Sequence, residues 1–417
     1  LVIPLTGRPQ EAVCKISLKE AIEQAVGYNK QLKASRKELD IYREKVKEAI
    51  SGGLPQIATG VNYSTNFGYS MNLGGNSISM EDQADFTASV SQLIFDGQWI
   101  VGIKSSKLSE KLAGQQLEIT ELDIKKSVVD SYFVILVGNR NLEILGENLQ
   151  NMEENLKHTR YMYEAGTVEL TDVNQIRINV STLKNSLLST ERSVEVNKKL
   201  LLLQLGLPAE TRLELSDKLD SFLKLGDYMK LKANPFTLQI NPEYRLQTIQ
   251  TEVQEKMVSL QKWSFAPTIS GTYSYPNKIM EPAFSMSPEH AGSITLSLPV
   301  FTGLQRRSAL NQEKFLLEQA QLNKSYLEDE LQLTDRQYRY ELENALENYR
   351  LQKENIIVAR QVLDNYKHKY EAGTISSLDL TTANNSYLQA ESDFTAACLT
   401  LFQARTQMER LHNLLPY

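Results

Sequence analysis

The feature that most constrains this chain is a tandem repeat. Three short segments recur in the same order, namely 54–57 with 266–269, 95–97 with 301–303, and 163–167 with 370–374. The last pair is identical, Tyr-Glu-Ala-Gly-Thr, and Asp172 and Asp379 follow it at the same distance. Each copy is about half of the 417 residues, far longer than a solenoid repeat. We therefore expect repeat one over 1–208, a link over 209–240 and repeat two over 241–417.

Each repeat contains two segments in which apolar and polar side chains alternate. Over 56–73 the apolar positions fall on one side, and they are Ile57, Val61, Tyr63, Phe67, Tyr69, Met71 and Leu73. Similar alternation follows over 84–95, and again over 268–275 and 293–298. A period of two is typical of strands with one apolar face. The pattern predicts hairpins at about 55–96 and 266–302, hence four strands, with no bulge between 56 and 73 and a longer first connection around 74–76.

The rest of each repeat is expected to be helical. No Gly or Pro lies between Gly303 and Gly373, and the stretch from Gly97 to Gly166 has only scattered Gly. A helix of that length measures about 100 Å. Apolar residues recur every seven positions, as at Leu342, Tyr349, Ile356, Leu363 and Tyr370. Such heptads indicate coiled-coil packing, so each repeat should read helix, hairpin, long helix, helix.

Composition argues against several classes of function. The net charge is −6 without a basic block, so no nucleic-acid surface is expected. The four His form no His-x-x-x-His pair, and no Gly-x-Gly-x-x-Gly or nucleophile elbow occurs. We therefore expect no enzyme activity, metal or cofactor. Cys14 and Cys398 lie far apart, and two unpaired thiols are favoured over one disulfide.

The strands raise the question of a membrane. No run of 18 apolar residues could span a bilayer as a helix. Strands with an apolar face could instead contact lipid while their polar face lines water. Four strands cannot close a barrel, and open edges do not occur in hydrocarbon, so several chains would share one. Two chains give eight strands and three give twelve, and a water-filled interior favours the larger number. A soluble sheet, in a coiled-coil scaffold or tether, is the alternative.

At this point the chain resembles the TolC-like outer membrane efflux proteins over essentially its whole length. The resemblance is carried by the tandem duplication, the 18–29 helix start, the Pro55 and Pro267 strand entries, the Phe-x-Gly strand exits and the Tyr-x-x-Gly-Thr turns. It implies a mainly α protein with membrane β: a homotrimer whose shared twelve-stranded barrel lies in the outer membrane. A long coiled-coil α-helical barrel would continue it through the periplasm, and the 209–240 link would belong to an equatorial belt.

The resemblance also implies a function and partners. Such proteins are passive exit ducts for small molecules or peptides in tripartite efflux or type I secretion systems. They dock to a periplasmic adaptor protein and an inner-membrane pump. The turns at Gly166, Thr167, Gly373 and Thr374 would form the periplasmic tip where the adaptor docks.

The periplasmic aperture is expected to involve Thr171, Asp172, Tyr370 and Asp379. Some family members carry an Arg at the position of Ile375 and a second Asp at the position of Thr382. The resemblance therefore leaves a hydrogen bond from Tyr370 to Asp172 as the candidate latch. The alternative for Asp172 and Asp379 is a simple stabilising role in the first turn of a helix.

The apolar strand face is expected to point to lipid. The residues assigned to it are Tyr63, Phe67, Tyr69, Tyr273 and Tyr275. Their counterparts on the polar face, such as Asn62 and Asn66, would line the lumen.

Overall fold

The computed structural model describes residues 13–74, 76–79, 81–280 and 288–415. Its helices are α1 (Leu18–Tyr28), α2 (Lys30–Ser51), α3 (Gly97–Glu164), α4 (Leu170–Leu205), α5 (Leu225–Ala233), α6 (Pro242–Trp263), α7 (Gln305–Glu371) and α8 (Ser377–Leu411), with short 3-10 turns η1 (Leu219–Phe222) and η2 (Leu238–Ile240). Its strands are β1 (Val13–Ile16), β2 (Gln56–Ser64), β3 (Ser70–Leu73), β4 (Asn76–Ser79), β5 (Gln83–Phe95), β6 (Arg212–Leu215), β7 (Thr268–Met280) and β8 (Ala291–Ser297).

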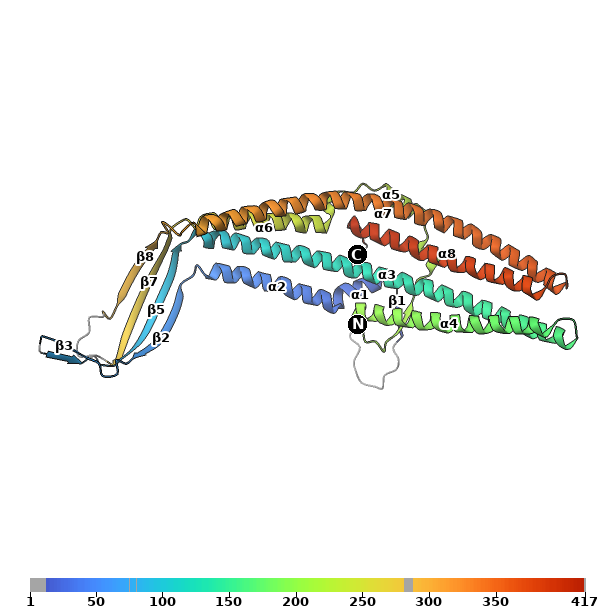
Figure 1. Ribbon diagram of the computed structural model, residues 1–417, viewed down its shortest axis with the longest axis horizontal. Helices are drawn as coiled ribbons and strands as arrows, with labels where there is room; N and C mark the ends of the chain where they lie inside the picture. The colour runs from blue at the N-terminus through green and yellow to red at the C-terminus, as the bar shows by residue number, and fades with distance from the viewer. Residues whose placement is uncertain (1–12, 75, 80, 281–287, 416–417) are drawn as a thin grey trace. The chain divides into compact units, whose positions relative to one another are not determined.

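The chain divides into two units, each drawn from both repeats. Unit 1 comprises Leu1–Ser35, Leu117–Tyr244 and Leu327–Tyr417, and unit 2 comprises Arg36–Gln116 and Arg245–Tyr326. Unit 1 contains α4, α8 and the larger part of α3 and α7, and unit 2 contains the first turns of α3 and α7 and the main sheet (Figure 1). Within the described residues, no helix is long and apolar enough to cross a membrane.

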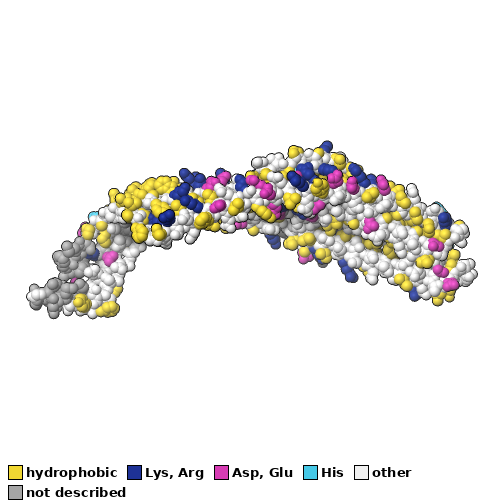
Figure 2. Space-filling view, turned by 45° about the horizontal axis from the view of Figure 1, so that its top comes forward, with side chains coloured by type: hydrophobic (Ala, Val, Ile, Leu, Met, Phe, Trp, Pro, Cys, Tyr) yellow, Lys and Arg dark blue, Asp and Glu magenta, His cyan; other side chains and the backbone are white. Residues whose placement is uncertain are grey.

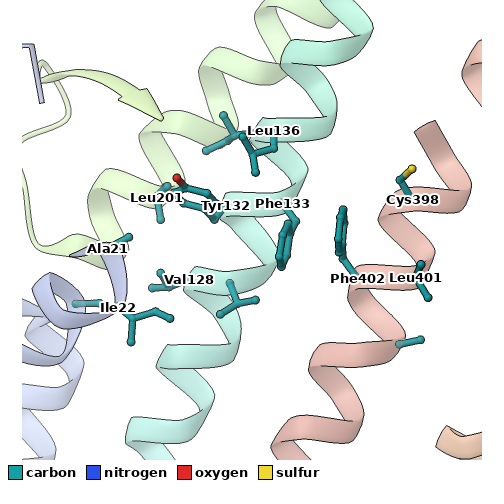
Figure 3. Packing of buried hydrophobic residues seen from close by; sticks show 14 of the residues in the cluster. Ala21, Ile22, Val128, Tyr132, Phe133, Leu136, Leu201, Cys398, Leu401 and Phe402 are labelled. Carbon is teal, nitrogen blue, oxygen red and sulfur yellow. The ribbon is translucent and has the colours of Figure 1, made fainter. Parts of the chain in front are cut away.

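Unit 1 is held by a core in which the predicted heptads face inward. Leu342, Tyr349, Leu363 and Tyr370 are all buried. At the centre of the largest cluster, the rings of Phe133 and Phe402 stack at 4.1 Å and join α3 to α8 (Figure 3). The helices of unit 1 therefore share one closely packed hydrophobic core.

The link between the repeats adds β6 to this core, beside β1 from the start of repeat one. These strands pair in parallel, with Val13 opposite Arg212. Asp217 accepts hydrogen bonds from the backbone N–H of Leu18 and from the hydroxyl of Tyr132, at 2.8 and 2.9 Å. The link therefore fastens the start of α1 to α3.

Two asparagines at equivalent places clamp the ends of the repeats. The side chain of Asn29 accepts from the N–H groups at the start of α2 and donates to the carbonyl of Gln204 at 2.8 Å. Asn241 accepts in the same way at the start of α6 and donates to the carbonyl of Leu411 at 3.0 Å. Both side chains are buried. Each asparagine thus ties the helix that leads into a β-hairpin, α2 or α6, to the last helix of the same repeat, α4 or α8.

Unit 2 is built on a four-stranded antiparallel sheet in the order β2-β5-β7-β8. The two hairpins, one from each repeat, meet at the β5–β7 pair (Figure 1). Trp99 and Trp263 lie where strands give way to helices. A side chain at Gly53 would overlap the Trp99 ring, and one at Gly97 would overlap Trp263. Both glycines are therefore required by close approach.

The first strand is shorter than the sequence pattern suggests. Alternation over 56–73 predicts one unbroken strand, but β2 ends at Ser64 and a turn follows, in which Tyr69 N–H bonds to the carbonyl of Asn66 at 2.9 Å. Phe67 has φ 50° and Gly68 has φ 72° in this turn. The chain then enters β3, which pairs with β4 in a separate two-stranded sheet. The longer first connection around 74–76 falls there, and Gly75 lies outside the described residues.

Candidate functional site

The two helical hairpins of unit 1 end in turns of the same geometry. Gly166 and Gly373 have φ 74° and 70°, which is the left-handed conformation that ends helices. After each, a threonine N–H bonds five residues back, Thr167 to Met162 at 2.9 Å and Thr374 to Lys369 at 3.0 Å. The threonine hydroxyls donate to the same carbonyls. All four residues predicted for the tip thus lie in matching turns.

The two aspartates that follow these turns cap the returning helices. Asp379 accepts from the hydroxyl and the N–H of Ser376, at 2.7 and 3.0 Å. Because these bonds stabilise the ionised form, they hold the pKa of the Asp379 carboxyl below its usual value. Asp172 accepts from the N–H of Glu169 at 3.2 Å, and Thr171 donates to the Glu169 carboxylate at 3.1 Å. Both carboxylates therefore have a capping role, whatever else they do.

Near the turns, hydrogen bonds between oxygen atoms connect the hairpins to each other. The hydroxyls of Tyr370 on α7 and Thr159 on α3 lie 2.9 Å apart, and both side chains are buried. Ser377 on α8 donates to Asp172 on α4 at 2.5 Å. We call these two bonds the clasp. Within the described chain, Tyr370 and Asp172 therefore bond to Thr159 and Ser377, and not to each other as expected.

Sequence reasoning missed two members of the clasp, Thr159 and Ser377. Neither is shared by the repeats, since Tyr366 and Leu170 stand at the equivalent positions. The available signal was local: each is a hydroxyl residue placed on a helix face that otherwise packs apolar side chains.

Towards the turns, each hairpin has an apolar interior, whereas the seam between α4 and α8 mixes polar and apolar side chains. Met152, Ile176 and Val180 pack between α3 and α4, and Leu363 and Leu380 between α7 and α8. Between the hairpins lies a cleft of about 520 Å³, lined by the apolar Ile144, Leu145, Met152, Leu183 and Leu388 and by the polar Asn141, Asn179, Thr182, Ser186, Thr190, Asn385, Gln389 and Ser392. The amide nitrogens of Asn179 and Asn384 are buried without a partner in the described part of the chain. At this cleft, the hairpins are thus less firmly packed against each other than in the core around Phe133 and Phe402.

The main sheet of unit 2 has one apolar and one polar face. Directly paired residues share a face, and the register pairs Ile57 with Val90, Val90 with Tyr273, and Ile269 with Leu296. The large side chains of the apolar face include those of Ile57, Val61, Tyr63, Phe86, Val90, Tyr273, Tyr275, Ile294 and Leu296. The opposite face consists of Gln56, Asn62, Ser64, Asp85, Thr87, Ser89, Ser91, Thr272, Ser274, Ser293, Thr295 and Ser297.

The apolar face is uncovered in the single chain. Val61 is 69% exposed and Ile294 is 78% exposed. Exposed apolar side chains continue where the strands meet the helices, at Val300 and Phe301 among others (Figure 2). Of the predicted lipid-facing residues, Tyr63, Tyr273 and Tyr275 belong to this face, whereas Phe67 and Tyr69 lie in the turn after β2. An exposed apolar surface of this extent marks an interaction site.

Comparisons with known proteins agree with this architecture. The sequence profile of the outer membrane efflux protein family matches twice, over residues 21–206 and 237–414. Outer membrane protein TolC of Vibrio cholerae is 22% identical, covering 95% of this chain and 92% of that protein. Outer membrane efflux protein BepC of Brucella suis is also 22% identical, covering 97% and 88%. The outer membrane channel CmeC of Campylobacter jejuni superposes with a TM-score of 0.79 at 15% identity, covering 99% and 93%.

The chain therefore belongs to the outer membrane efflux protein family. Members of this family are passive channels of the outer membrane and not enzymes. This places the chain in the outer membrane, with its paired helices forming the periplasmic part.

Proposed function

We propose that three copies of this chain form an exit duct through the outer membrane and periplasm, serving tripartite efflux or type I secretion of small molecules or peptides. The observation that carries the proposal is the four-stranded sheet with one uncovered apolar face and unpaired edges at β2 and β8 in the described chain. An open edge is excluded from hydrocarbon, so the sheet needs further strands at both sides.

The number of copies follows from the polar face. Its side chains are almost all short, as at Ser89, Ser274 and Thr295. About eight strands leave room only for side chains, whereas more strands leave an aqueous channel. Three copies, with twelve strands, satisfy both the closure of the sheet and a polar interior. A soluble scaffold would have no use for the uncovered apolar face.

The partners we propose are a periplasmic adaptor protein, which docks on the tip turns at 166–167 and 373–374, and an inner-membrane pump. Supporting this, the two turns share one geometry and are exposed. A set of matched turns around one end of a tube offers equivalent docking points. Bulky substitutions there, such as Thr167→Trp with Thr374→Trp, should block export while the trimer still assembles.

The test is reconstitution of the purified chain into planar bilayers, with its mass measured in detergent. A detergent-extracted trimer that conducts ions supports the proposal. A chain that is soluble and monomeric without detergent would overturn it. For the partners, capture of the adaptor by the unchanged chain but not by the double tryptophan variant is the expected result.

A further inference from the structure

The two repeats allow the contact between neighbouring copies to be read from a contact inside one chain. β2 and β7 open the hairpins of their repeats and are related by Pro55 and Pro267, an offset of 212. β5 and β8 close the hairpins and are related by Phe95 and Phe301, an offset of 206. The pair β5–β7 joins the second strand of one repeat to the first strand of the other. A β8 edge meeting the β2 edge of a second copy is the same kind of pair.

The hairpins themselves confirm that these offsets preserve register. In repeat one, Ile57 lies opposite Val90 and Gln56 opposite Ser91. Applying the two offsets gives Ile269 opposite Leu296 and Thr268 opposite Ser297. These are the pairs found in repeat two. The same offsets can therefore be applied to the β5–β7 pair.

We infer that β8 of one copy pairs antiparallel with β2 of the next, with Leu296 opposite Val61. In the chain, Val90 lies opposite Tyr273, Ser89 opposite Ser274 and Ala88 opposite Tyr275. The offsets convert these pairs to Leu296 with Val61, Thr295 with Asn62, and Ile294 with Tyr63 of the next copy. This inference rests on the proposed assembly of several copies and specifies its register.

The chemistry of the two edges supports this register independently. Leu296, Ile294, Val61 and Tyr63 all belong to the apolar face, and Thr295 and Asn62 belong to the polar face. Both faces therefore continue across the contact without a break. A slip of one residue would place the apolar side chains of one copy beside the polar side chains of the next. Aromatic and branched side chains such as Tyr63 and Ile294 also form stabilising cross-strand pairs.

The register can be tested by cysteine cross-linking in membranes. Thr295→Cys is combined with Cys at Ala58, Asn62 or Ser64, all on the polar face of β2. Cα atoms of directly opposed residues lie about 4.5–5.5 Å apart, within disulfide range, whereas Ala58 is displaced by about 14 Å. Cys14 is replaced by Ser, and Cys398 is kept, because its burial raises its pKa to about 12 and shields it.

We expect a reducible trimer band that is strongest with Asn62→Cys, weaker with Ser64→Cys and absent with Ala58→Cys. Leu296→Cys with Val61→Cys gives a second, lipid-side test if the first pair fails to insert. A maximum at another β2 position, or no cross-link in a variant that still conducts as a trimer, would overturn the register. Failure of the unchanged chain to form an oligomer would instead contradict the proposed function.

Discussion

At the scale of single residues, buried polar side chains connect parts of the chain that are distant in sequence. We expect Asn241→Ala to lower the free energy of unfolding by about 2–4 kcal/mol, because it removes a helix cap and leaves the carbonyl of Leu411 without its donor. Thermal unfolding in detergent, followed by circular dichroism, measures the change. Asn241→Ser, which keeps a capping oxygen, should cost less, and exposed Asn323→Ala should cost little. Equal effects at Asn241 and Asn323 would contradict a clamping role.

The clasp gives a second prediction, on gating. Tyr370→Phe and Thr159→Val remove the same hydrogen bond, so each should raise the open probability in planar bilayers and the double variant should add little more. The coupling between them is expected to be about 1 kcal/mol. Tyr370→Phe combined with Asp172→Asn should instead be additive. Strong coupling between these two substitutions would instead support a direct Tyr370–Asp172 hydrogen bond.

The ionisation of the Asp379 carboxyl leads to a prediction of how the ion selectivity of the pore depends on pH. Its folded pKa lies below the ordinary value of about 3.9. The ionised form, and the capping it provides, is therefore present above that value and is lost only as the pH falls through the lower folded pKa. A ring of carboxylates at a narrow aperture should favour cations. We expect this cation preference, measured as a reversal potential in a salt gradient, to persist from neutral pH down to about 3.9 and to fall only at lower pH. Asp379→Asn should reduce the preference throughout, and a transition near pH 6 would point to another group.

At the scale of elements, the alternation of β2 can be tested directly. Val61→Arg should hamper membrane assembly, since a charge facing lipid costs about 2–4 kcal/mol near the bilayer midplane. The neighbouring Asn62→Arg should be tolerated, because its side chain lies on the polar face. The amount of folded oligomer in the membrane fraction is the measurement. Equal loss in both variants would refute the assignment of the faces.

The same strand shows what sequence can and cannot predict. Heptad residues such as Leu342 and Tyr349 are buried as expected, because helical periodicity and tertiary packing demand the same face. Alternation past Ser64 was misleading, because Phe67 stands in a turn where side-chain period no longer reports a strand. The partner of Tyr370 was not predicted, because Thr159 belongs to the other repeat and a hydroxyl on an apolar helix face does not identify the residue that it meets.

At the scale of the whole molecule, the clasp has a consequence for symmetry. Three copies would place six similar hairpins around the tube and so create six seams. Exchange of the repeats would convert the Ser377–Asp172 bond into a contact of Leu170 with Asp379 of the next copy, and leucine has no donor. The Tyr370–Thr159 bond would become a contact of Tyr163 with Tyr366, which keeps both hydroxyls. The three seams between chains would then lack only the Ser377–Asp172 part of the clasp, so the duct would be threefold and would open first between chains.

This difference can be removed by one substitution. Leu170 is exposed, so Leu170→Ser should be tolerated by the fold and would supply the missing hydroxyl to the seams between chains. We expect this variant to conduct less, with a lower open probability in planar bilayers, and the effect to vanish when Asp379→Ala is added. An unchanged open probability would mean that the six seams do not alternate in strength. By this reasoning, the loss of a single hydroxyl between two otherwise similar halves is enough to make the three boundaries between chains weaker than the three inside them.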